Sequence, residues 1–80
     1  MFYVVEVNKE KSGANSQAIL AYDTLDAAVV AFHQSVAYAM SNENVTYMAR
    51  TILDEAMNYV SPRRIEVYER LVSEEDDAAN

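Results

Sequence analysis

The first part of the chain has the residue pattern of a β-strand. Residues 2–8, FYVVEVN, are mostly aromatic and β-branched, and these residue types favour extended structure. Both alternating sets of side chains are mainly apolar, with Phe2 and Val4 on one side and Tyr3, Val5 and Val7 on the other. A strand that is apolar on both sides is either covered on both faces of its sheet or faces a partner.

A hairpin is predicted to follow this strand. Residues 9–16, KEKSGANS, contain Gly13, the only glycine of the chain, and are predicted to form a loop. Residues 17–22, QAILAY, are then predicted to be the second strand. The loop is long for a hairpin, which suggests a mobile tip.

Residues 24–41 carry the strongest pattern in the chain, that of an α-helix. Asp23 or Thr24 can cap its N-terminus, and Asp26 suits the positive end of the helix dipole. Apolar residues recur at the helical spacing of a core stripe, which comprises Leu25, Ala28, Val29, Phe32, Val36, Ala39 and Met40.

The opposite side of this helix does not turn polar. Ala27, Ala31 and Tyr38 lie there, with Val30 and Ala37 beside them. A helix that is apolar nearly all round must be covered on more than one side, and a chain of 80 residues has too little other material to do this. We therefore expect the protein to self-associate through Ala27, Ala31 and Tyr38.

The second half of the chain is predicted to form a second hairpin. Residues 45–53, VTYMARTIL, have strand composition, and residues 59–71 alternate from Arg64 onward as a fourth strand does. The segment 49–60 also fits a helical stripe, so a second helix is the alternative. Pro62 cannot donate to a sheet ladder and is expected at the start or the edge of the last strand.

The predicted fold is therefore α+β, with one helix packed on a four-stranded, mostly antiparallel sheet in the order ββαββ, and oligomeric. Residues 1–72 form the single predicted domain. Residues 73–80, SEEDDAAN, hold four of the 13 acidic residues and no basic one, and we expect them to be a flexible acidic tail.

Charge and composition exclude several classes of protein. The formal net charge of −7, with six basic residues, leaves no basic footprint for direct nucleic-acid binding. The chain has no cysteine, so it has no disulfides and no thiol nucleophile. No apolar run is long enough to span a membrane, and the N-terminal apolar run precedes its lysines, which is the reverse of a secretory signal. We therefore expect a cytoplasmic protein.

Three short stretches resemble a group of small proteins from phages and prophages of gut Firmicutes. They are Tyr3-Val4-Val5-Glu6, Tyr22-Asp23-Thr24-Leu25-Asp26-Ala27-Ala28 and Phe32-His33-Gln34. The resemblance extends from residue 2 to about residue 53 and weakens beyond it. That group has Tyr before the His and a Gly in the final turn, whereas this chain has Phe32 and no such Gly. The resemblance implies a phage origin and a fold, but no activity.

No catalytic or metal-binding constellation is present in the sequence. His33 is the only histidine, no serine lies in a G-x-S-x-G context, and Gly13 stands alone rather than in a phosphate-binding loop. The paired carboxylates Asp54-Glu55, Glu74-Glu75 and Asp76-Asp77 are expected to serve the turn and the tail. We therefore expect no enzyme activity, no metal and no cofactor.

Five residues are candidates for binding a small anionic ligand: His33, Tyr47, Arg50, Arg63 and Arg64. Guanidinium forks suit phosphate or carboxylate groups, and tyrosine rings offer stacking area with a polar tip. Each residue also has an ordinary structural interpretation. The arginines can form surface ion pairs, and His33 can be a half-buried residue at the edge of the core.

Two classes of function fit these features. The first is a phage-encoded counter-defence protein that sequesters a small nucleotide-type immune signal without catalysis. The second, which the charge of −7 favours, is an acidic inhibitor of a basic host defence protein that binds nucleic acid, as anti-CRISPR proteins do. A structural or accessory phage protein is a third possibility.

The acidic tail provides the first testable prediction. Truncation after Val72 should leave the midpoint of thermal unfolding unchanged, because a solvated charge run contributes no packing. Circular dichroism of the truncated and the full-length protein measures this midpoint. A large loss of thermal stability would show that residues 73–80 dock on the domain.

Overall fold

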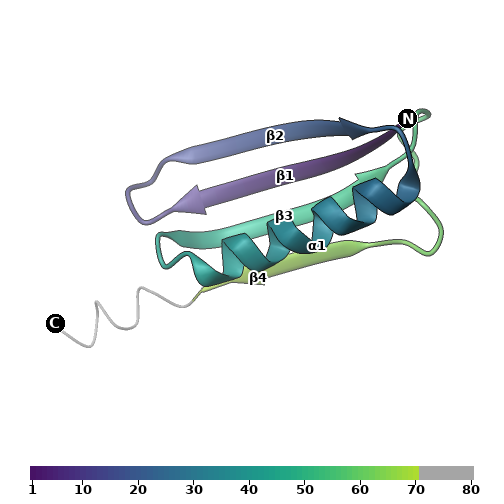
Figure 1. Ribbon diagram of the computed structural model, residues 1–80. Coiled ribbons are helices and arrows are strands. Elements are labelled where there is room, and N and C mark those ends of the chain that lie inside the picture. The colour runs from purple at the N-terminus through teal and green to yellow at the C-terminus, as the bar shows by residue number, and fades with distance from the viewer. Residues whose placement is uncertain (71–80) are drawn as a thin grey trace, which may run out of the picture.

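A computed structural model describes residues 1–70, so the predicted tail at 73–80 lies outside the described residues. The elements follow one another as four strands and one helix: β1 (Phe2–Glu10), β2 (Asn15–Tyr22), α1 (Leu25–Ser41), β3 (Val45–Leu53) and β4 (Ile65–Glu69). The four strands form one antiparallel sheet in the order β2-β1-β3-β4 (Figure 1). The predicted α+β fold with one helix and four strands is confirmed.

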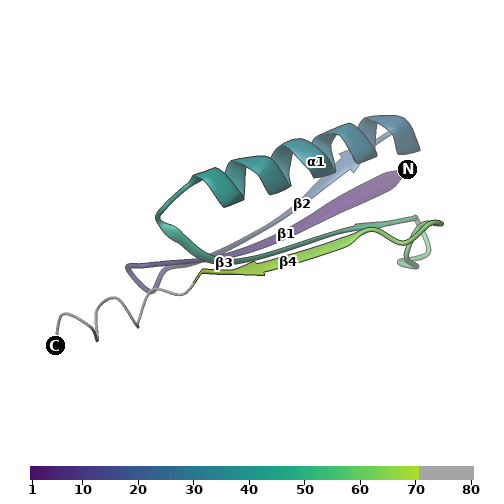
Figure 2. The same cartoon turned by 90° about the horizontal axis from the view of Figure 1, so that it is seen from below.

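The helix lies across one face of the sheet. Strands β2 and β3 both run antiparallel to β1, so they are parallel to each other and α1 connects them as a crossover. This crossover is right-handed, as nearly all such connections are, and its hand determines which face α1 covers (Figure 1). Seen edge-on, the sheet has α1 on one side and no described element on the other (Figure 2).

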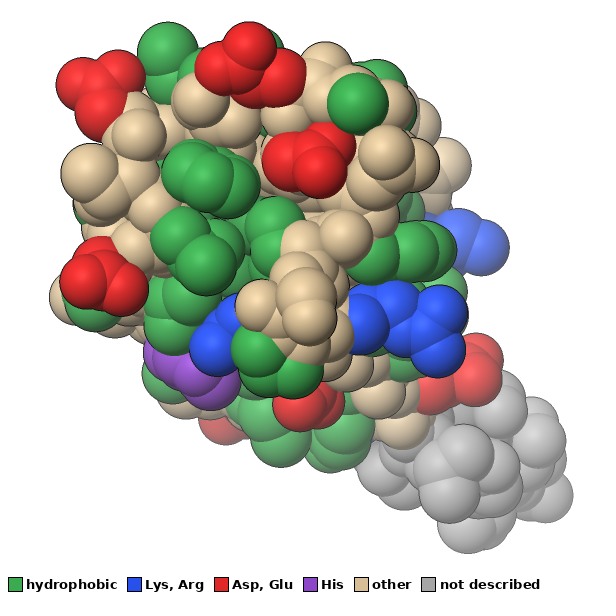
Figure 3. Space-filling model, turned by 90° about the vertical axis from the view of Figure 1, so that its right-hand side faces the viewer, with side chains coloured by type: hydrophobic (Ala, Val, Ile, Leu, Met, Phe, Trp, Pro, Cys, Tyr) green, Lys and Arg blue, Asp and Glu red, His purple; other side chains and the backbone are tan. Residues whose placement is uncertain are grey.

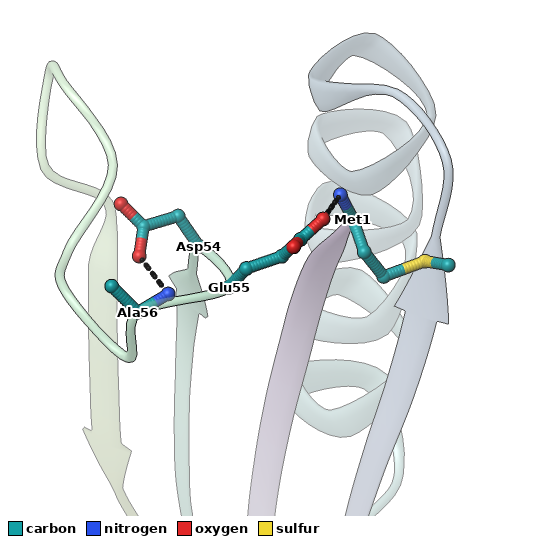
Figure 4. Close-up of polar contacts among 4 residues, drawn as sticks. All are labelled: Met1, Asp54, Glu55 and Ala56. Carbon is teal, nitrogen blue, oxygen red and sulfur yellow. Dashed lines mark hydrogen bonds and ion pairs between the residues drawn. The ribbon is translucent and has the colours of Figure 1, made fainter.

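The segment after β3 forms the predicted turn rather than a second helix. The Asp54 carboxylate accepts a hydrogen bond from the backbone N–H of Ala56 at 2.9 Å (Figure 4). It accepts a second one from the backbone N–H of Asn58 at 3.1 Å. Met57 takes the left-handed conformation with φ of 67°. The Met1 amino group forms an ion pair with Glu55, which joins the start of β1 to this turn (Figure 4).

The predicted start of the fourth strand and the predicted length of the first loop need correction. The fourth strand begins at Ile65 and not at residue 59, and Tyr59 makes only an isolated bridge with Leu53. Pro62, which lacks a backbone N–H, lies in the segment that leads into β4. The first loop is also shorter than predicted, because β1 and β2 extend to a tip of residues 11–14, where Gly13 adopts a φ of 91°. A short hairpin tip replaces the predicted long loop.

The helix follows its predicted boundaries and most of its predicted core stripe. Thr24 is the N-cap, and its hydroxyl accepts a hydrogen bond from the Ala27 N–H at 3.1 Å. Met40 departs from the predicted stripe, because its side chain is 46 % exposed. Ala31, which was predicted on the outer side, packs against the edge of the core.

The core lies between α1 and the central strands. Its main cluster joins Ala28 and Phe32 of the helix to Val4 of β1, Ile52 of β3 and Val60. A second cluster lies under the last turn of the helix and contains Ala39, Val45 and Met48. At that end the Arg70 guanidinium donates to the Met40 carbonyl at 2.9 Å, which places a positive charge at the negative end of the helix dipole.

A charged cluster lies between these two apolar clusters, beneath the helix. The Arg50 side chain is only 2 % exposed and projects from β3 toward α1. Its Nε donates to the Ser35 hydroxyl at 2.6 Å, and its Nη1 donates to the carbonyls of Val7 at 3.0 Å and Ala49 at 3.1 Å. The Ser35 hydroxyl in turn donates to the Glu6 carboxylate. Ser35 therefore bridges two charged residues that are paired across β1 and β3.

Burial disfavours the charged form of the Arg50 side chain. Desolvation lowers the pKa of the Arg50 guanidinium, and the Glu6 carboxylate acts in the opposite direction. Guanidinium groups titrate so far above neutrality that Arg50 remains a cation near pH 7. Arg50 is thus a buried cation whose hydrogen-bond acceptors lie on three elements of the fold, namely α1, β1 and β3.

The hydrogen bonds of this cluster predict that the Ser35 hydroxyl on α1 stabilises the fold. Ser35→Ala should lower the free energy of unfolding by about 1–3 kcal/mol, because it leaves the Arg50 Nε–H and the Glu6 carboxylate without their shared partner. Urea denaturation at pH 7 measures the loss.

Ser41→Ala is the matched control on the same helix. The Ser41 hydroxyl donates to the Tyr38 carbonyl at an exposed site, so its removal should change stability by less than about 0.5 kcal/mol. Equal losses for the two variants would contradict the structural role of the cluster.

Candidate functional site

The face of the sheet that α1 does not cover is the most unusual surface of the protein. Side chains alternate between faces along each strand, so residues such as Val4, Arg50 and Ile52 point toward the helix. Their neighbours Val5, Ala49 and Thr51 point to the other face. No element among residues 1–70 packs on that face (Figure 2).

Cross-strand pairing arranges this face in rows. The row at one end is polar, and we call it the polar row: Asn15, Lys9, Tyr47 and Glu69. The next positions along the strands form a surface that we call the open face, with three residues each from β1, β2 and β3, two from β4, and Tyr59. They are Gln17, Ile19, Ala21, Tyr3, Val5, Val7, Ala49, Thr51, Leu53, Ile65, Val67 and Tyr59. The open face carries no charged side chain and only two residues, Gln17 and Thr51, that are neither aliphatic nor aromatic.

Exposure on the open face increases from the central strands to the edges. Val5, Val7 and the β3 residues are half-buried by their neighbours in the sheet. On the edge strands, Ile19 is 67 % exposed and Val67 is 57 % exposed. Antiparallel sheets with one free face usually turn polar side chains to water, and this one turns apolar side chains to it.

The open face is hollowed over β3. A cavity of about 240 Å³ is bounded by Val5, Val7, Ala49, Arg50, Thr51, Tyr59 and Ile65. The small side chains of Ala49 and Thr51 lie between larger residues on β1 and β4. The hollow thus follows from the sequence of β3, which places its smallest side chains at the centre of the face.

Arginine and tyrosine side chains lie at the end of the hollow away from the polar row. The Arg63 guanidinium lies over the Tyr59 ring at 5.2 Å from its centroid. Arg64 is half-buried and donates to the Pro62 carbonyl at 3.1 Å, while its own carbonyl accepts from the Thr51 hydroxyl at 2.9 Å. Arg63 is therefore the arginine best placed to meet a ligand in the hollow.

The structure does not bring the five predicted ligand-binding residues together. Tyr47 lies in the polar row beneath Lys9, whose Nζ is 5.6 Å from the ring centroid. That row is about 20 Å from the Tyr59 end at the usual rise per residue, so Tyr47 is far from Arg63. Arg50 lies beneath the helix on the opposite side of the sheet from Tyr47.

His33 is separate from the other four residues as well. It is exposed on α1 and lies edge-on against the Phe32 ring, with 5.2 Å between the ring centroids. Only Arg63 and Arg64 of the predicted set are neighbours. Within a single chain, the predicted pocket of histidine, tyrosine and arginines is thus dispersed over both layers.

The outer side of α1 is the second apolar surface. Val30 is 56 % exposed, and Ala27 and Tyr38 are exposed as well. Asp26, His33 and Gln34 interrupt this side, whereas no charge interrupts the open face. The predicted helix contact through Ala27, Ala31 and Tyr38 stays a prediction, with Ala31 half-buried against the core.

Charged side chains are exposed at one end of the molecule (Figure 3), whereas none lies on the open face. Figure 3 shows the end where the N-terminus lies, and apolar side chains are exposed there between acidic and basic ones. Among residues 1–70, no group of three or more His, Asp or Glu side chains could hold a metal ion. The described part of the chain also has no helix long and apolar enough to cross a membrane.

The sequence indicated the open face only at β1, where both alternating sets of side chains are mainly apolar and one helix can cover only one of them. It did not indicate that β2, β3 and β4 continue this apolar surface. Comparison of the chain with protein-family models, curated proteins and solved structures finds no match.

Proposed function

We propose that the protein is a non-catalytic binding protein whose contact surface is the open face of its sheet. The observation that carries this proposal is the absence of charge over twelve neighbouring positions of a face that no described element covers. Contiguous apolar patches of this kind mark interaction sites on folded proteins, because their exposure to water is unfavourable.

The chemistry of the open face favours a macromolecular partner. Aliphatic and aromatic side chains can bury area against a complementary surface, and Tyr3 and Tyr59 add large contact area with polar tips. The resemblance to phage proteins supports a counter-defence role for this binding. The acidic charge of the chain lies outside the open face, so a basic host protein, which this charge favours as an alternative target, would be contacted by other surfaces.

Sequestration of a small anionic ligand is a second candidate function. The observation in its favour is the hollow, where Tyr59 and Arg63 combine a ring face with a guanidinium fork. A nucleotide could place its base in the hollow and its phosphate against Arg63. Its base would meet Val5 and Ile65 rather than a second aromatic ring.

Photo-crosslinking tests the proposed contact surface. A benzophenone amino acid replaces Val67 on the open face or, as the matched control, Val30 on the outer side of α1, since the two valines are 57 % and 56 % exposed. In bacterial cells that express the full chain, light should give a covalent product from position 67 and little from position 30. Products from position 30 alone, or from neither position, would contradict the proposal.

A thermal-shift screen with cyclic dinucleotides and ADP-ribose derivatives tests the second candidate. A ligand at about 100 times its dissociation constant adds roughly 2.7 kcal/mol to stability. Arg63→Ala should abolish the resulting shift and His33→Ala should not, because only Arg63 lies beside the hollow. No shift with any of these compounds would leave the macromolecular contact as the function.

A further inference from the structure

The open face has the size and the pattern to pair with itself. We infer that its occupant is a second copy of this chain, packed face to face about a two-fold axis that runs parallel to the strands between β1 and β3. This inference rests on the proposed function, because it names the partner of the same surface.

The area of the open face and the polar row together is sufficient for a dimer. Four strands about 4.8 Å apart, over the roughly 26 Å of strand length that the four rows occupy, give a flat area of about 500 Å² per copy. Two such faces together reach the ~1,000 Å² that a specific interface needs, before the corrugation of the side chains is added. Sheets that pack face to face in this way lie about 10 Å apart with nearly aligned strands.

The charges on the polar row select one orientation of the two copies. An axis parallel to the strands places the polar row of one copy against the polar row of the other, with Glu69 of one copy beside Lys9 of the second copy. An in-plane axis perpendicular to the strands would instead place Lys9 over Tyr3 and Glu69 over Tyr59. That arrangement would separate Glu69 from Lys9 and move both charges over tyrosine rings of the apolar contact, which is less favourable than pairing the two charges at its edge.

Side-chain sizes also complement one another in the selected orientation. Strand β1 of one copy lies over β3 of the other, so Val7 and Val5 meet Ala49 and Thr51, the small residues that form the hollow. Strand β2 lies over β4, which brings Ile19 to Ile65. Large residues thus face small ones at the centre, as close packing requires.

Sedimentation velocity of the full chain over a dilution series tests this inference. The wild-type protein should sediment as a dimer of its 9.0 kDa chain. Val67→Glu and Ile19→Lys, on opposite edge strands, should each raise the dissociation constant about a hundredfold or more, because each buries a charge in the contact. Val30→Glu on α1 is the matched control and should remain a dimer.

Chemical crosslinking tests the orientation. The chain has no cysteine, so Gln17→Cys and Val67→Cys can be introduced together without background. A short bis-maleimide should link these positions between copies, because β2 of one copy lies over β4 of the other. Gln17→Cys alone should give little product, and efficient linkage of this single variant would overturn the proposed orientation.

The outcomes distinguish this inference from the proposed function. A monomeric wild-type protein whose position 67 still crosslinks to a different polypeptide would overturn the dimer and leave the proposed function intact. A dimer that survives Val67→Glu and Ile19→Lys but dissociates with Val30→Glu would overturn both, and would place the contact on the helix. Circular dichroism of each variant establishes that it is folded.

Discussion

The hydrogen-bonded contact of Arg50 with Ser35 beneath the helix is the interaction on which the rest of the structure depends. Because side chains alternate along a strand, turning Arg50 toward α1 also turns Met48 and Ile52 toward it. The same register pairs Arg50 with Glu6, whose carboxylate accepts from the Ser35 hydroxyl. A shift of β3 by one residue would expose this side of the strand and leave the charged groups without their partners.

This register has a consequence for the opposite surface. With Glu6 and Arg50 placed under the helix, the middle of β1 and β3 on the other side contains only Val5, Val7, Ala49 and Thr51. The buried face of the sheet is thus more highly charged at its centre than the open one. A sheet face that is free of charge therefore arises from the same alternation that creates the charged cluster, and the two features need no separate explanation.

Much of the fold could be predicted from periodicity, whereas the surface could not. The helix and the strand at 45–53 were predicted within one residue, because both have a strong and regular pattern. The burial of Arg50 could not be predicted, since it depends on a hydroxyl from α1 and a carbonyl from β1 that are distant in sequence.

Alternation alone could have revised part of the predicted ligand site. Tyr47 and Arg50 are three residues apart in one strand, so they must point to opposite faces. Alternation does not determine which face of the sheet the helix covers. That follows from the right-handed crossover between β2 and β3. The alternation of Ile65 and Val67 in β4 is equally compatible with a core-facing strand, and the sequence contains no sign that these residues lie on the open face.

Intermolecular contacts measured by isotope-filtered NMR test the central claim most directly. In a mixture of labelled and unlabelled full-length protein, the account predicts nuclear Overhauser effects between copies from the methyl groups of Val5 and Val7 to those of Thr51 and Ala49. Intermolecular effects that involve Ala27 and Tyr38 of α1 instead, or no intermolecular effects at all, would contradict the account.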